Sequence, residues 1–309
     1  MRATLVLAAA MAAAATLACT MPANAGPKIY LGVQGSLLQY SGDDFEGFGS
    51  SIGQSNSNFS SFSTNPDHGW GGRIWADVEL NDRLLLRGSF NGAWFDRSER
   101  EDSSSLNSDF SATNKQKAEL DAIWATLEGF YTWSFGRPAR PHTRIGLGGG
   151  AEYAEVENTQ RFGDTTFFDG EPFFDDQARQ RSDFWGIGPR ASAYIDHELG
   201  ESGLHFFGEA GVAYLFGDRD TKFKEAIEFS DGSSSFKDND SDGGNVIHTN
   251  LRVGVGYDLP FAGFPPTRIE AGWSYDHFFD SNNVQFLPGN KDGDNNFGGP
   301  FLAVGIAFN

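Results

Sequence analysis

The chain has 309 residues, a formal net charge of −19, and an unusual abundance of glycine (39) and phenylalanine (29). This excess of carboxylates argues against a nucleic-acid-binding role, because phosphates need Lys and Arg partners. Glycine together with aromatic residues indicates β-structure in which backbones approach closely. Beyond the N-terminus no segment has the length and apolarity of a membrane-spanning helix. This leaves a secreted soluble β-protein or a membrane barrel whose apolar residues alternate with polar ones.

The first part of the chain, residues 1–25, has the pattern of a cleaved signal peptide. Arg2 supplies a positive charge, residues 5–18 are apolar, and the small residues Ala-Asn-Ala at 23–25 form a cleavage site. The only cysteine of the chain lies in this segment, so the mature protein has no disulfide. We therefore expect a single domain over residues 26–309.

Downstream, apolar and charged residues alternate in one segment after another. In residues 70–80, Trp70 and Ile74 share one parity, whereas Arg73 and Asp77 share the other. This alternation predicts strands with one apolar face and one polar face, each long enough to cross a bilayer at a tilt. We expect about ten such strands, at residues 29–39, 70–80, 83–96, 121–135, 144–153, 185–196, 204–216, 247–257, 268–276 and 301–308.

The connections between these strands alternate strictly between long and short. The long ones are residues 41–69, 97–115, 158–181, 218–245 and 280–298, and the short ones are 81–82, 136–141, 200–202 and 259–265. A soluble sandwich has no reason to sort its connections in this way. The pattern predicts an all-β, antiparallel transmembrane barrel with short periplasmic turns and long acidic external loops.

Aromatic residues of the apolar parity lie near the strand ends, as expected of the girdles at the two membrane interfaces. They are Trp70, Trp94, Tyr131, Trp133, Trp185, Tyr214, Tyr257, Trp273 and Tyr275. Trp124 and Phe130 have the opposite parity and interrupt the alternation of their segment. The periodicity alone leaves the direction of these two side chains open.

The charged parity is expected to line the lumen of the barrel. Its members are Arg73, Asp77, Glu79, Arg87, Glu128, Arg144, Glu152, Arg190, Glu209, Arg252, Arg268 and Glu270. Both signs inside a narrow barrel have two interpretations. They line a small water-filled path, or they neutralise one another and close the barrel. Eight strands leave space only for side chains and sixteen form a channel, so about ten strands lie nearer the closed end.

Residues from about 69 to the end resemble the Legionella-type major outer membrane protein family of pore-forming barrels. The stretches that carry the resemblance are DFWGIGPRASAYIDHELG, LHFFGEAGVAYLFGD, LRVGVGYDLP and RIEAGWSYDHFF. The chain departs from the family pattern in its very acidic external loops and in Asn309, which follows Phe308. The resemblance implies an exported outer-membrane barrel of a Gram-negative bacterium that forms a pore, and it identifies no solute.

The last segment, FLAVGIAFN, alternates Leu302, Val304 and Ile306 with small residues. In a closed barrel the final strand must pair with the first, residues 29–39, so that no strand edge is left open in lipid. Outer-membrane barrels that this chain resembles end on an outward aromatic that serves as an assembly signal, a role that would pass to Phe308. The expected partners are outer-membrane lipids and the outer-membrane assembly machinery, with no cofactor and no metal.

Three motifs suggest other functions. The glycines at 146–150 loosely match a dinucleotide fingerprint, but no helix follows. Residues 238–243 resemble the opening of a calcium loop, but Thr249 stands where a bidentate Glu belongs, which excludes an EF-hand. A rim-site hydrolase would use residues of the set Asp67, His68, Asp96, Asp276 and His277.

Hydrolysis is disfavoured because Asp276 and His277 are consecutive and point to opposite faces of a strand. The sequence therefore predicts a small passive pore with a charged lumen and no enzymatic activity. A non-conducting structural or surface-binding barrel is the alternative.

Overall fold

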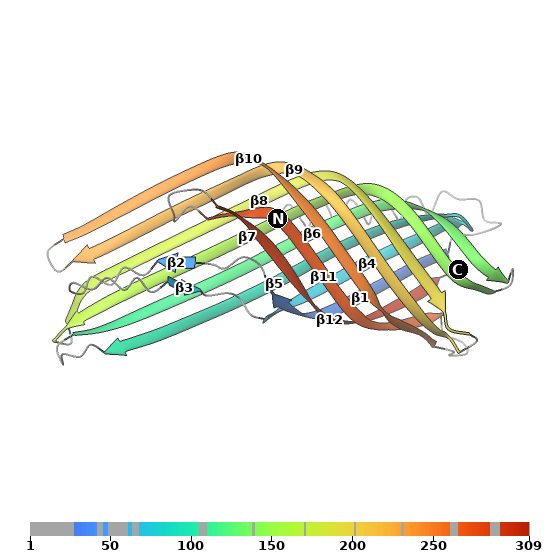
Figure 1. Cartoon of the computed structure of the whole chain (residues 1–309), viewed down its shortest axis with the longest axis horizontal. Coiled ribbons are helices and arrows are strands. Elements are labelled where there is room, and N and C mark those ends of the chain that lie inside the picture. Colours follow the sequence, from blue (N-terminus) through green and yellow to red (C-terminus); the bar gives the residue numbers. More distant parts are fainter. Residues whose placement is uncertain are drawn as a thin grey trace.

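The computed structural model describes residues 28–41, 46–48, 61–63, 68–104, 110–137, 140–169, 171–200, 202–229, 232–259, 265–284 and 291–308. The predicted signal peptide, residues 1–25, lies outside this part of the chain. Within it, ten strands form a closed antiparallel barrel, which confirms the predicted fold (Figure 1). None of the described segments is a helix long and apolar enough to cross a membrane.

The barrel strands are β1 (Lys28–Tyr40), β4 (His68–Asn81), β5 (Leu84–Ser104), β6 (Phe110–Arg137), β7 (Arg140–Phe168), β8 (Glu171–Glu198), β9 (Leu204–Phe229), β10 (Gly232–Leu259), β11 (Thr267–Val284) and β12 (Lys291–Phe308). Each pairs with the next barrel strand along the chain, and β12 pairs with β1. Two short strands, β2 (Glu46–Phe48) and β3 (Ser61–Ser63), pair with each other in a separate sheet.

The first and last strands close the barrel as expected. Ile29 lies opposite Phe308, and the pairing continues to Tyr40 opposite Phe297. On its other side β1 pairs with β4. Backbone groups of the seam are thus hydrogen-bonded between strands, which lipid requires because it offers no partners of its own.

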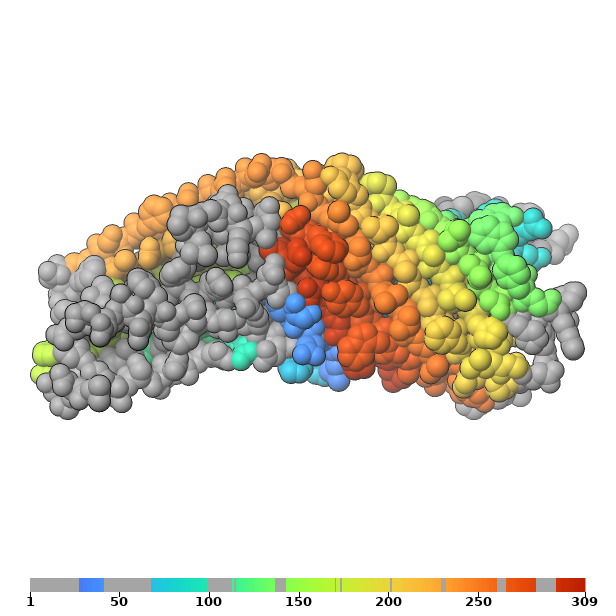
Figure 2. All heavy atoms as spheres, in the orientation of Figure 1, coloured from blue at the N-terminus to red at the C-terminus, as the bar shows by residue number. Residues whose placement is uncertain are grey.

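The two faces of the wall follow the sequence parity. Leu302 is 61% exposed and Val33 58%, whereas Ala303 is 2% exposed. The predicted girdle residues face outward and are exposed, except Tyr275, which is half-buried. Figure 2 shows the outside of β9 to β12 as a continuous surface. Trp124 and Phe130, which the alternation left open, are buried inside the barrel.

Glycine and aromatic residues face each other across neighbouring strands inside the lumen. Gly32 lies opposite Trp75, and a Cβ built at Gly32 would be 2.1 Å from the indole ring. Gly146 lies opposite Tyr194, where a Cβ would come within 2.2 Å of the phenol ring. At these two positions the lumen accommodates an inward aromatic beside a residue that has no side chain, which accounts for part of the glycine-rich composition.

The prediction of long external loops is wrong for most of their residues. Most of residues 97–115, 158–181, 218–245 and 280–298 belong to strands. Strands β5 to β10 extend furthest, toward the left of Figure 1. Backbone hydrogen bonds with neighbouring strands order these segments despite their polar composition. These segments have polar residues at both parities, which predicted loops. A sheet that extends out of the membrane is also polar at both parities, because both of its faces contact water. The connection at 41–69 lies largely outside the described residues.

Three of the predicted short turns lie where the sequence predicts them, and the fourth, at 259–265, lies largely outside the described residues. The β4–β5 turn contains Asp82 and Arg83, and β6 ends three residues before β7 begins. In the β8–β9 connection, Gly200 and Gly203 have positive φ angles of 72° and 77°. These backbone conformations favour glycine because the Cβ of any other residue would clash with its own backbone.

The outer extension carries a pH-sensitive carboxyl group. Burial, followed by the carboxylates of Glu225, Asp164 and Asp175, raises the pKa of Asp176 from 3.8 to about 6. The folded sheet therefore holds this proton more tightly than an unfolded segment does. The protonated group stabilises the extension fully below pH 3.8. This contribution is lost as the pH rises through about 6.

We accordingly expect hydrogen-exchange protection of residues 160–180, corrected for the intrinsic exchange rate, to fall between about pH 4 and pH 7. An Asp176→Asn variant should show protection that no longer depends on pH in this range. A fall of the same size in the variant would show that another group is responsible.

Candidate functional site

The lumen contains the predicted charged residues. Side chains fill it from its middle toward its external end. At the end near the short turns there is a cavity of about 470 Å³, which we call the periplasmic vestibule. Its wall includes Tyr30, Trp75, Arg144, Tyr194 and Phe207. Above it the free space shrinks to a cavity of about 40 Å³ between Arg73, Asn91 and Arg190, together with neighbouring side chains. This upper space is of the size of one or two water molecules.

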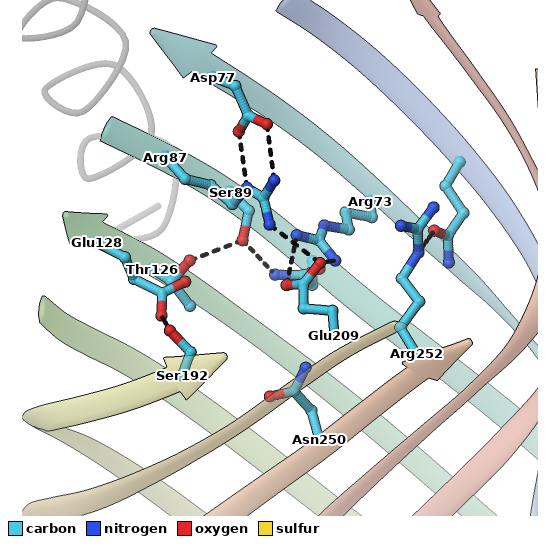
Figure 3. Close-up of polar contacts among 12 residues, drawn as sticks. Arg73, Asp77, Arg87, Ser89, Thr126, Glu128, Ser192, Glu209, Asn250 and Arg252 are labelled. Atoms are coloured by element: carbon cyan, nitrogen blue, oxygen red, sulfur yellow. Dashed lines mark hydrogen bonds and ion pairs between the residues drawn. The ribbon is translucent and has the colours of Figure 1, made fainter. Parts of the chain in front are cut away.

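The first closing layer is an ion network around Glu209 (Figure 3). Arg87 donates two hydrogen bonds of 2.7 Å to the carboxylate of Asp77, and its Nη1 lies 3.2 Å from Glu209 Oε2. Arg73 Nη2 lies 3.1 Å from Glu209 Oε1, and its Nη1 lies 3.4 Å from Glu209 Oε2, the oxygen that Arg87 also contacts. The network joins β4, β5 and β9 across the barrel interior, so it spans the lumen as well as lining it.

Arg190 forms the second layer. Its Nε donates to Glu128 Oε1 at 2.9 Å, its Nη1 to Glu152 Oε2 at 2.6 Å, and its Nη2 to Asn250 Oδ1 at 2.6 Å. The side chains are almost fully buried, with exposures of 3% for Arg190, 1% for Glu128 and 0% for Glu152. Ser192 also hydrogen-bonds to Glu128. Such a set is stable only when every charge has a partner.

His248 continues this layer, and the sequence analysis did not select it. Its Nδ1 lies 2.5 Å from Glu152 Oε1 and its Nε2 lies 3.3 Å from Asp276 Oδ1. The ring stacks on Phe278 at a centroid distance of 3.9 Å. The inward parity of residue 248 was visible in the sequence. Its partner Asp276 lies on the neighbouring strand β11, whereas Glu152 lies on β7, which only the barrel brings near.

A third layer is apolar, and we call it the aromatic plug: Tyr40, Phe95, Trp124, Phe278 and Phe297. The centroids of Phe95 and Phe297 are 5.5 Å apart, and those of Trp124 and Phe278 are 5.6 Å apart. All five side chains are buried, with exposures of at most 6%. They come from β1, β5, β6, β11 and β12, so the plug crosses the lumen from wall to wall.

The remaining predicted residues pair nearer the periplasmic end. Arg252 Nη2 lies 2.6 Å from Glu270 Oε2, and its guanidinium is 4.4 Å from the ring centroid of Phe301. Arg144 pairs with Glu79. Arg268 pairs with Asp196 at 2.6 Å and Asp258 at 2.8 Å, two carboxylates that the sequence analysis did not assign to the lumen. Every charged residue predicted for the lumen therefore has an ion-pair partner in the structure.

Among the described residues of the rim-site hypothesis, Asp96, Asp276 and His277 are not brought together. Asp276 points inward to His248, whereas His277 Nε2 lies 3.0 Å from Asp294 on a different side of the strand. Asp96 has a side-chain exposure of 66% and pairs with Lys117. Asp67 lies outside the described residues. His248 is sealed from solvent, so its carboxylate partners do not form an accessible catalytic site.

The two other sequence motifs lie within strands. The glycines at 146–150 belong to β7, and Asp238 to Gly243 belong to β10, where the side chains are exposed. In the described part of the chain, no group of three or more His, Cys, Asp or Glu residues is arranged to hold a metal ion.

The closed antiparallel barrel with an apolar outer belt and a charged lumen defines an outer-membrane β-barrel protein. The family described as "Legionella pneumophila major outer membrane protein precursor" matches residues 20–308, and the chain belongs to this family. Its members are proteins of the bacterial outer membrane, and this chain is one of them. No curated protein matches the chain.

Similar solved structures are outer-membrane barrels of low sequence identity. Neisserial surface protein A is 12% identical, covers 91% of this chain and 97% of its own, and has a TM-score of 0.31. The outer membrane protease OmpT from Escherichia coli is 10% identical over 94% of this chain and 99% of its own, with a TM-score of 0.40. A major outer membrane protein from Thermus thermophilus is 14% identical over 91% and 99%, with a TM-score of 0.28. These similarities are too distant to support a function.

Proposed function

We propose that this protein is an outer-membrane barrel that is closed to solutes at rest, and that it holds an external β-sheet above the membrane. The observation that carries this proposal is the three-layer closure of the lumen: the Glu209 network, the Arg190 network and the aromatic plug. Of the two interpretations of the charged lumen, neutralisation is favoured over a water-filled path, because the charges meet one another directly.

The energetics of the layers support the same conclusion. A solute would have to separate fully buried ion pairs, which leaves desolvated charges behind. It would then have to displace the aromatic plug. The cavity next to Trp124 of the plug has a volume of about 40 Å³. Thermal movement of a single side chain does not open such a path, because each layer is held by several strands.

The external sheet supports the second half of the proposal. Strands β5 to β10 continue past Trp94 and Trp185 of the upper girdle, and β7 alone has 29 residues. About ten residues suffice to cross a membrane. A protein that served only as a membrane anchor would not need this extension. We therefore propose that the external sheet makes the protein's contacts outside the membrane.

A passive pore is the second candidate, and the vestibule favours it. The cavity of about 470 Å³ is lined by both charged and aromatic residues and has the size of small-molecule sites. A pore would require the layers above it to rearrange. Removal of residues 1–25 as a signal peptide, and handling of residues 26–309 by the outer-membrane assembly machinery, remain part of either proposal. No hydrolytic activity is proposed, because His248 is sealed.

Purified protein in planar bilayers distinguishes the two candidates. We expect the wild type to give no conductance steps. Discrete steps of reproducible size from the wild type would overturn the closed barrel and support the pore. Heat-modifiable mobility of the sample shows that a silent protein is folded.

A variant that removes large side chains from two of the three layers tests whether these layers block the lumen. Trp124→Ala combined with Glu128→Ser and Arg190→Ser removes a plug residue and both members of one ion pair, so we expect conductance steps. The matched control changes the neighbouring outward residues, Leu127→Ala and Ala191→Ser, and should remain silent. If the first variant is folded and silent, the barrier lies elsewhere in the lumen.

A further inference from the structure

The last strand of the barrel leaves space in the periplasmic vestibule because its inward residues are small. Gly305 and Ala307 of β12 line the vestibule and lie opposite Gly32 and Tyr30 of β1. A Cβ built at Gly305 would make only ordinary contacts, with its nearest neighbours 3.8 Å away, one of them in the indole ring of Trp75. The cavity of about 470 Å³ has the size of a site for a small molecule.

The vestibule is reached from the periplasmic side of the barrel. Lys28, Leu259 and Thr267 line it, and they are the terminal residues of β1, β10 and β11 at the end with the short turns. At the same end Asp258 is exposed and Arg268 is partly exposed. A ligand from the periplasm therefore reaches the vestibule without crossing the layers that close the lumen.

The charges of the vestibule wall cancel one another. Six basic and six acidic residues line the cavity. Each of the six carboxylates pairs with an arginine that belongs to the same wall. A ligand with a net charge would therefore meet attraction and repulsion of similar size. A neutral ligand that carries both hydrogen-bond donors and acceptors suits this wall better.

A hydroxyl group can contact such an ion pair without breaking it. It accepts a hydrogen bond from the guanidinium and donates one to the carboxylate. Neighbouring hydroxyl groups on a sugar ring also match the two-pronged edges of guanidinium and carboxylate groups. Arg268 and Asp258 offer such a pair near the mouth of the vestibule, with Nε 2.8 Å from Oδ1.

Aromatic rings complete the wall of the vestibule. Its lining includes Tyr30, Trp75, Tyr194 and Phe207. Tyr30 is half-buried and lies opposite the small residue Ala307 near the mouth. The C–H faces of a sugar ring are apolar and pack on aromatic side chains. Paired ions and aromatic rings together favour a carbohydrate over a purely apolar or a purely ionic ligand.

Three buried polar atoms of the lining residues have no hydrogen-bond partner in the part of the chain that the structure describes. They are Tyr194 Oη and the Nε atoms of Arg73 and Arg144. Folded proteins contain few such atoms, because a buried donor without a partner is unfavourable. The hydroxyl groups of a ligand supply the missing partners when a partly exposed side chain such as Arg144 shifts.

We propose that the periplasmic vestibule binds a small neutral carbohydrate of one or two rings. Its hydroxyl groups contact the ion pairs and Tyr194, and its ring packs on the aromatic side chains beside Gly305. A charged amino acid is disfavoured because it would compete with ion pairs that are already complete. The site lies on the periplasmic side of the closing layers, so this inference goes beyond the proposed function and does not depend on whether the lumen conducts.

The test uses the processed chain, residues 26–309, folded in nanodiscs of neutral phospholipid without any sugar-based detergent. Saturation-transfer difference NMR detects binding of glucose, maltose, trehalose and sucrose, and titrations give the dissociation constants. We expect at least one of these sugars to bind, with an affinity that changes little with salt because the ligand is uncharged. Glutamate and arginine, which carry a net charge, should bind more weakly.

Two variants locate the site in the vestibule. Gly305→Leu puts a bulky side chain into the cavity and should weaken binding at least about tenfold. Its matched control, Val304→Leu, changes the neighbouring residue on the lipid face and should bind like the wild type. Tyr194→Phe removes one hydroxyl group and should weaken binding about fivefold, as expected for the loss of one hydrogen bond. Its control is Tyr214→Phe on the outer face.

Tyr194→Phe also separates binding from stability. The hydroxyl group has no partner in the described part of the protein, so the urea concentration at the midpoint of unfolding should not fall. The proposal is overturned if none of the four sugars binds, or if glutamate or arginine binds more tightly than every sugar. An unchanged affinity in a folded Gly305→Leu or Tyr194→Phe variant would also overturn it. Heat-modifiable mobility confirms that each variant is folded.

Discussion

Replacing Arg190 with Leu is expected to lower the free energy of unfolding by about 3–5 kcal/mol. The substitution removes the partner of Glu128 and one partner of Glu152, whose side chains are 1% and 0% exposed. Water cannot reach these carboxylates to replace the lost hydrogen bonds. Urea unfolding in lipid vesicles, followed by tryptophan fluorescence, measures the change.

The neighbouring residue provides the control for this substitution. Ala191 is exposed on the lipid face, so Ala191→Leu should change the free energy of unfolding by less than about 0.5 kcal/mol. Adding Glu128→Gln to Arg190→Leu should recover part of the loss, because it removes one uncompensated charge. If Arg190→Leu and Ala191→Leu have equally small effects, Arg190 does not hold the lumen together.

Changing Phe308 to Asp is expected to reduce the heat-modifiable outer-membrane form of the protein sharply. Phe308 lies opposite Ile29 at the seam and is 44% exposed on the outer face. Asp would put a carboxylate into the membrane boundary where β12 must pair with β1. It would also remove the aromatic that we propose as the assembly signal. Outer-membrane fractions, analysed with and without heating, report the folded amount.

Two milder variants separate assembly from simple strand pairing. Phe308→Tyr keeps an aromatic ring at the interface and should assemble normally. Deleting Asn309 alone should have little effect, whereas deleting Phe308 and Asn309 together should resemble Phe308→Asp. Normal assembly of Phe308→Asp would show that the seam forms without the aromatic, and the assembly-signal proposal would then be wrong.

The sequence by itself determined the direction of most side chains and the order of the strands. Parity separates Trp70 from Arg73 and Leu302 from Ala303 because a strand alternates its faces with a period of two. The short turns were equally clear, since they combine Asn, Asp, Gly and Pro between alternating segments. These signals are local, so they can be read without knowledge of distant parts of the chain.

Strand length was decided by the tertiary structure. Residues 218–245 have the Ser, Asp and Gly content of a loop, yet β9 and β10 continue through them and pair from Gly244 opposite Gly217 to Gly232 opposite Phe229. Neighbouring strands supply the hydrogen bonds that the composition does not suggest. A sheet with water on both faces loses the apolar alternation from which its length could be recognised.

The identity of the partners was likewise decided only by the tertiary structure. Arg190 meets Glu128 and Glu152, which lie 62 and 38 residues away in the chain, because the register of the adjacent strands β6, β7 and β8 places Gly150 between Glu128 and Arg190 in one row. His248 of β10 meets Glu152 of β7, and Trp124 of β6 meets Phe278 of β11, because the closed sheet curves these separate strands around one interior. Alternation determines that a side chain points inward, but the register and curvature of the closed sheet determine what it meets there, and therefore whether the lumen is open or closed.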